Sequence, residues 1–196
     1  MTSLALTDWN NSRRGKITLL WNLHSQLSGP QSAAWHAEAA LAMVLQRMAT
    51  EFQGFARGLH DEATEVFVRH VAAGSTNLET ILRERMTADR ALNKGNAHDD
   101  AVKRDFSRLG LTFWPTMQAA DKRANTWEKE LRKIVEMRNG VAHDDTGKIL
   151  RLNGDGYNLD VPTLQSWHKM LDELCVCMDD VVGTYLSALL GIQRPW

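Results

Sequence analysis

The chain has 196 residues, of which 43% are hydrophobic and 24% are charged. This length lets one domain bury a core without disulfides or metals, and the composition is that of an ordinary globular protein. Lys and Arg number 23 against 24 Asp and Glu, which excludes nucleic-acid binding through global positive charge. No apolar stretch approaches a membrane span and no leader pattern opens the sequence, so we expect a cytoplasmic protein with no membrane partner.

Apolar residues recur at helical spacing along most of the chain, which predicts an all-α fold. A long helix is expected over 32–59, beginning near Gly29-Pro30, and another over 163–190. Shorter helices are expected near 61–72, 77–92, 99–109 and 119–138, with Asn77 and His98-Asp99 as caps. The first fifteen residues are expected to be loosely held. No repeat or linker divides the chain, which predicts a single domain over 1–196 with its core at about 32–190.

One segment departs from the helical pattern. Residues 148–161 read KILRLNGDGYNLDV, which are two short β-prone runs around an Asn-Gly-Asp-Gly turn. We therefore expect a small β-hairpin inserted before the last long helix.

The sequence offers no metal or cofactor site. Cys175 and Cys177 are two residues apart on an expected helix, so their side chains diverge and neither a disulfide framework nor a thiolate site is expected. The histidines lack the spacing of zinc ligands.

Charge is distributed unevenly despite the near-zero total. Residues 81–138 carry 13 basic and 9 acidic side chains, whereas residues 139–196 carry 4 and 8. Solvated helix faces explain this imbalance, and so does a local phosphate-facing surface. On the second interpretation, Arg132 and Lys133 are candidate substrate-binding residues.

Arg138 interrupts an apolar stripe. The seam Trp127, Leu131, Ile134 continues by four residues to this arginine. A guanidinium cannot lose its charge, so such a position needs an acidic partner, backbone carbonyls or a bound anion. Asn139 follows directly, and His143 lies five residues after the arginine in the segment MRNGVAHDD.

This segment resembles the motif of the HEPN superfamily of helical domains, which is Arg, four to six residues, then His, often with a polar residue after the Arg. The layout is similar to the RiboL-PSP-HEPN branch, with an early long helix containing EFQGFARGL and a long helix after the motif. The resemblance covers about residues 32–190. It implies an HEPN-like helical bundle.

The resemblance also implies a metal-independent endoribonuclease without a cofactor, of a toxin-antitoxin or defence type, in which the motifs of a homodimer meet in one cleft. RNA would be the substrate, and an antitoxin or other protein a possible partner. His143 would act as general acid and base, Arg138 would hold the scissile phosphate, and Asn139 would orient one of them. Glu51 or Gln53 would supply a polar group from the earlier helix.

Two positions depart from the family pattern. Some members carry, two residues after the histidine, a tyrosine that a partner nucleotidyltransferase modifies, and this chain has Asp145 there. Many members have glycine directly after the histidine, where this chain has Asp144.

Helix geometry leaves two arrangements open. Residues five apart lie about 140° apart around a regular helix. Either the helix ends at Gly140 and His143 turns back toward Arg138, or the two groups act from both sides of a dimer cleft. Two other functions also remain: an inactive HEPN scaffold that binds RNA, nucleotide or protein, and an assembly protein in which Arg138 and His143 only close a helix end.

Overall fold

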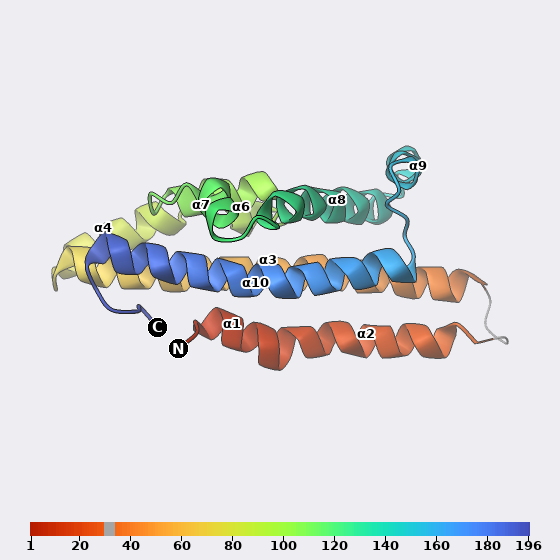
Figure 1. Ribbon diagram of the computed structural model, residues 1–196, viewed down its shortest axis with the longest axis horizontal. Coiled ribbons are helices and arrows are strands. Elements are labelled where there is room, and N and C mark those ends of the chain that lie inside the picture. Colours follow the sequence, from red (N-terminus) through yellow and green to blue (C-terminus); the bar gives the residue numbers. More distant parts are fainter. Residues whose placement is uncertain (30–33) are drawn as a thin grey trace.

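The computed structural model describes residues 1–29 and 34–196, and its elements within these ranges are helical, with no strand (Figure 1). The all-α prediction is confirmed to this extent. The elements are α1 (Leu4–Asp8), a π-helical turn η1 (Trp9–Arg13), α2 (Arg14–Leu27), α3 (Ala34–Ala72), α4 (Thr76–Thr87), α5 (Ala91–Lys94), α6 (Asp99–Ser107), α7 (Phe113–Ala120), α8 (Ala124–Ala142), α9 (Thr146–Gly154) and α10 (Val161–Leu190). No described helix has an apolar stretch of the length that a membrane crossing requires.

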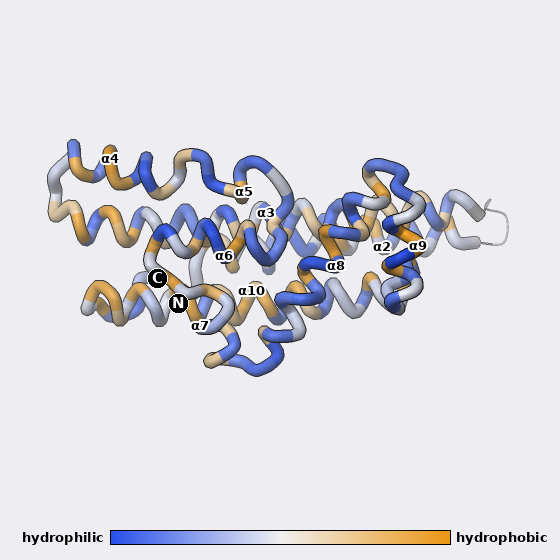
Figure 2. The backbone as a smooth tube through the Cα atoms, turned by 90° about the horizontal axis from the view of Figure 1, so that it is seen from above, coloured by the Kyte–Doolittle hydropathy of each residue, from blue (hydrophilic) through white to orange (hydrophobic). Residues whose placement is uncertain are grey.

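The two long helices α3 and α10 run side by side through the middle of the molecule (Figure 1). The α1–α2 segment covers one side of this pair, and α6, α7 and α8 cover the other. Residues spaced three or four apart, such as Leu45, Met48 and Phe52 on α3, are buried in one continuous core. Viewed from above, α4 lies beside the end of α3 that is far from α9 (Figure 2).

The first fifteen residues are packed, so the expectation of a loose N-terminus is wrong. Trp9 and Leu6 are buried, and Trp9 Nε1 donates a hydrogen bond to Asp172 on α10 at 2.9 Å. The Glu62 carboxylate accepts the backbone N–H groups of Leu4 and Ala5 at 2.8 and 2.5 Å. This carboxylate holds the first turn of α1 against α3, as favoured at a helix N-terminus.

Helix boundaries differ from the prediction in several places, and the helices before residue 28 were not predicted. The helices expected over 32–59 and 61–72 are one helix, α3, since no proline or turn separates them; the expected start near Gly29-Pro30 and Ser32 lies outside the described residues. The helix expected over 77–92 is divided into α4 and α5, and α4 is flanked by Ser75 rather than capped by Asn77. Helix α7 was not predicted, because Pro115 read as a break; it occupies the first turn, where no intrahelical bond is lost.

The predicted β-hairpin over 148–161 is wrong, because its first half forms α9. The Asp145 side chain caps this helix by accepting the Lys148 N–H at 3.0 Å. Leu152 is fully buried, and Ile149, three residues earlier, packs against the core, so the apolar residues also fit helical spacing. Gly156, with φ 88°, lies in the turn after the helix.

Candidate functional site

Helix α8 continues past Gly140 and ends at Ala142, with His143 as its C-cap. The Asp145 N–H donates to the Gly140 carbonyl at 2.8 Å and the Asp144 N–H to the Val141 carbonyl at 3.4 Å, which is the Schellman pattern of helix ends. The arrangement in which the helix stops at Gly140 is therefore excluded. Positions 138 and 143 lie about 140° apart around one helix.

The Arg138 side chain is half-buried and has no carboxylate partner within ion-pair distance among the described residues. Its Nη1 donates to Asn139 Oδ1 at 3.1 Å, while its Nε is buried without a hydrogen-bond partner in the described part of the chain. Buried polar groups are normally paired, so the free Nε and the uncompensated charge both favour an anion from outside the chain.

Two further side chains fix the position of this arginine and its neighbour. Asn96, in the segment between α5 and α6, donates its Nδ2 to Asn139 Oδ1 at 3.0 Å. Gln46 on α3 donates its Nε2 to the Arg138 carbonyl at 3.2 Å. The Arg138–Asn139 pair is therefore tied to α3 and to the α5–α6 segment, and its geometry does not depend on α8 alone.

The His143 side chain is exposed at the end of α8, and its ring makes no hydrogen bond to the described residues. Its backbone N–H donates to the Asn139 carbonyl at 3.1 Å. The ring is thus free to exchange a proton with a bound molecule. A pure helix-closing role, with both Arg138 and His143 bonded inside one chain, does not account for this free ring.

Gly140 lets α9 lie directly over the motif. A Cβ built at this position would be 3.0 Å from Ile149 Cγ1 of α9, a tight contact that would require Ile149 to shift. The close contact of α9 with α8 places the turn from His143 to Asp145 between these two helices.

The predicted candidates on α3, Glu51 and Gln53, bond to residues outside the Arg138 motif. Glu51 is 3% exposed and is surrounded by cations: Arg13 Nη1 at 3.0 Å, Arg47 Nη2 at 2.7 Å and Lys16 Nζ at 3.7 Å. Gln53 donates to the Leu92 carbonyl of α5 at 2.9 Å. Both side chains hold neighbouring elements against α3, and neither has a hydrogen bond or ion pair to the side chains of Arg138, Asn139 or His143 among the described residues.

Arg132 and Lys133 also have partners within the chain. Arg132 pairs with the buried Asp99 carboxylate, its Nε at 3.1 Å from Oδ2. The Lys133 Nζ lies 3.5 Å from Glu136 and 3.4 Å from Asp155. Their charges are therefore partly neutralised, in contrast to that of Arg138.

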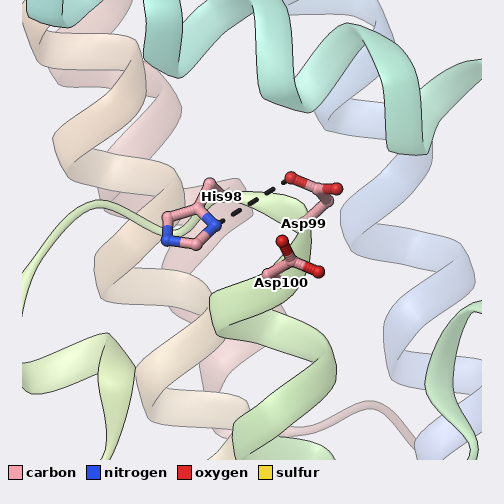
Figure 3. Close-up of side chains that lie close together, drawn as sticks. All are labelled: His98, Asp99 and Asp100. Carbon is pink, nitrogen blue, oxygen red and sulfur yellow. Dashed lines mark ion pairs between the residues drawn. The ribbon is translucent and has the colours of Figure 1, made fainter.

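His98, Asp99 and Asp100 cluster at the start of α6, with potential ligand atoms within 4.8 Å of one another (Figure 3). His98 is the N-cap that the sequence predicted, and its Nδ1 accepts the Ala101 N–H at 3.3 Å. Asp99 is engaged by Arg132. The cluster therefore caps α6 and joins it to α8.

No family model matches this chain, and neither the curated proteins nor the solved structures contain a match. The likeness to HEPN domains rests on the Arg-Asn-x3-His segment and on the order of the helices.

Sequence reasoning missed Gln46 and Asn96. Neither belongs to a motif, and each reaches the Arg138–Asn139 pair from another element. Only the tertiary packing of α3 and the α5–α6 segment against α8 reveals their roles.

Proposed function

We propose that this protein is a metal-independent endoribonuclease of the HEPN type, of a toxin or defence-like system, that cleaves RNA in a cleft between two copies of the chain. The observation that carries the proposal is Arg138, a half-buried cation with a buried, unpaired Nε and no carboxylate partner in the described residues. A phosphodiester is an anion of the size and geometry that a guanidinium binds.

In the proposed reaction Arg138 holds the scissile phosphate and stabilises the charge that develops on its oxygens. The Asn139 side-chain oxygen Oδ1 orients the guanidinium by accepting the 3.1 Å hydrogen bond from Arg138 Nη1, and the Asn139 side-chain nitrogen Nδ2 remains available as a further donor. Asn96 fixes this arrangement from the side.

His143 transfers the protons in the proposed reaction. As general base it takes the proton of the RNA 2′-hydroxyl while the 2′-oxygen attacks the adjacent phosphorus, and the bond to the 5′-oxygen breaks. The imidazole, protonated in this way, then supplies the proton to the leaving 5′-oxygen as general acid. The products are a 2′,3′-cyclic phosphate and a free 5′-hydroxyl.

The divergence of Arg138 and His143 on α8 supports a cleft built from two copies. Because Arg138 and His143 lie about 140° apart on one helix, they meet the same phosphate best when they come from different chains. An apolar hollow of about 380 Å³, lined by Leu20, Met43 and Gln46 among others, adjoins the Arg138 backbone through the Gln46 hydrogen bond. This hollow is a suitable contact surface for a second copy.

Cleavage of labelled single-stranded RNA in EDTA tests the proposal. We expect the unmodified protein to cut, and Arg138→Ala and His143→Ala each to lose at least about 100-fold in rate, the usual contribution of such groups. Arg104→Ala and His70→Ala are matched controls, since both side chains are exposed. Arg104 lies on α6, and His70 lies near the C-terminal end of α3.

Equal cleavage by the unmodified protein and both site variants would contradict the assignment. RNA binding that needs Arg138 but gives no turnover would instead identify the inactive HEPN scaffold.

A further inference from the structure

A second hollow, of about 560 Å³, opens beside His143. Its lining includes Val141 and Asp144, which flank His143 on either side in the sequence. The remaining wall comes from the start of α3, from α9 and from the segment before α10. Its volume falls in the range of small-molecule sites, and it is continuous with the turn that carries the proposed general base.

Trp35 stands at the rim of this hollow. All seven tryptophans lie in the described part of the chain, and Trp35, at 65% exposure, is the most exposed of them, whereas Trp9, Trp114, Trp127 and Trp167 are buried. Leaving a large aromatic in water forgoes the free energy of its burial. An exposed indole that lines the same hollow as the residues flanking the proposed general base offers a face on which a nucleobase can stack.

Among the polar side chains that line the hollow, hydrogen-bond acceptors outnumber donors. Glu38 and Asp144 line it and have no ion-pair partner among the described residues, and the Asn158 side chain makes no hydrogen bond there. Two free carboxylates repel a phosphate, but they accept hydrogen bonds from the amino groups of bases. The hollow is therefore suited to a base and not to the RNA backbone.

We propose that this hollow, with Trp35 at its rim, binds the nucleobase next to the scissile phosphate, and that it prefers bases carrying an amino group over uracil. The inference rests on the proposed ribonuclease function and specifies how that site recognises its substrate. Arg138 holds the phosphate, Trp35 stacks on the base, and Glu38 accepts its amino hydrogens. Cytosine and uracil are both single-ring bases and should stack similarly on Trp35. A comparison of the two therefore isolates the hydrogen bond between the amino group and Glu38.

The test uses 2′-O-methyl heptamers of cytidine and of uridine, which lack the nucleophilic hydroxyl and cannot be cut. We expect Trp35→Ala to weaken cytidine-heptamer binding by about 5- to 150-fold, the range for one lost base–aromatic stack, and Trp35→Phe to weaken it much less. The heptamer should quench a fluorescence component that Trp35→Phe lacks. Ile81→Ala, which removes an apolar side chain 57% exposed on α4, is the control and should bind normally.

Specificity gives a second measurement. The unmodified protein should bind the cytidine heptamer more tightly than the uridine heptamer, and Glu38→Gln should reduce that preference. If Trp35→Ala binds the cytidine heptamer as tightly as the unmodified protein, the proposed base site is wrong. It is also wrong if this variant no longer self-associates, because a second copy would then cover Trp35. If Arg138→Ala weakens binding while Trp35→Ala does not, only the base site fails; if neither variant matters, the proposed function fails as well.

Discussion

His60 is a titratable residue inside the core. It is fully buried, its Nδ1 accepts a hydrogen bond from Arg90 Nη1 at 3.0 Å, and its Nε2 donates to the Asp105 carbonyl at 3.0 Å. Burial, followed by the charge of Arg90, lowers the pKa of His60 to about 4. Arg90 also pairs with Asp61 at 2.5 Å, so one small polar network connects α3, α5 and α6.

This residue makes stability depend on pH. Between pH 6.5 and about 4 the unfolded chain protonates its histidine while the folded protein keeps His60 neutral, so the unfolded state binds more protons and stability falls as pH falls. We expect a loss of about 2 kcal/mol from His60 between pH 7 and pH 5. Urea unfolding of the unmodified protein and of His60→Gln at both pH values measures this loss of stability. An equal loss of stability in the two proteins would show that His60 is not its source.

Asp144 occupies the left-handed position after α8, with φ 50°. Glycine adopts this conformation without steric cost, which explains in physical terms why a glycine suits the position after the histidine. We expect Asp144→Gly to raise the free energy of unfolding by about 0.5–1 kcal/mol. Thermal unfolding checks this, with Asp100→Gly in the first turn of α6 as the control that should destabilise.

At the scale of elements, the Glu51 carboxylate attaches α2 to α3. Removing it leaves Arg13, Lys16 and Arg47 facing one another without their shared partner. Because these cations are themselves partly exposed, we expect Glu51→Ala to cost about 1–3 kcal/mol, less than a fully buried pair. Glu38→Ala, on the exposed face of the same helix, should change stability by less than about 0.5 kcal/mol. Denaturant unfolding of both variants distinguishes a structural Glu51 from a purely substrate-binding one.

The helices could be predicted because apolar residues at spacings of three and four identify a buried face, as in Leu45, Met48 and Phe52. The structure of the segment at 148–161 could not be predicted, because its short apolar runs fit the spacing of a helix as well as that of a strand. The Asp145 N-cap favours the helix that is observed. Arg138, Asn139 and His143 could be selected as candidates from their spacing. The hydrogen bond from Asn96 to Asn139 could not be predicted, because it depends on tertiary packing.

The proposed cleft requires the whole molecule to form a dimer whose contact surface adjoins Arg138. Met43 is 42% exposed and lines the apolar hollow next to Gln46. We expect Met43→Glu to separate the copies and to abolish RNA cleavage, because a charge in an apolar contact is costly to bury. Ile81→Glu, at the opposite end of the molecule, should leave both unchanged. Sedimentation velocity and cleavage assays measure the two effects, and a fully active Met43→Glu monomer would contradict the dimer cleft.

In the proposed mechanism, Arg138 of one copy acts with His143 of the other. The most direct test combines Arg138→Ala and His143→Ala chains in mixed dimers, purified through two different tags. Each mixed dimer then contains one intact composite site, so we expect about half the cleavage rate of the unmodified dimer, although each variant alone is inactive. No recovery in the purified mixed dimer would show that Arg138 and His143 act within one chain, and would contradict the account.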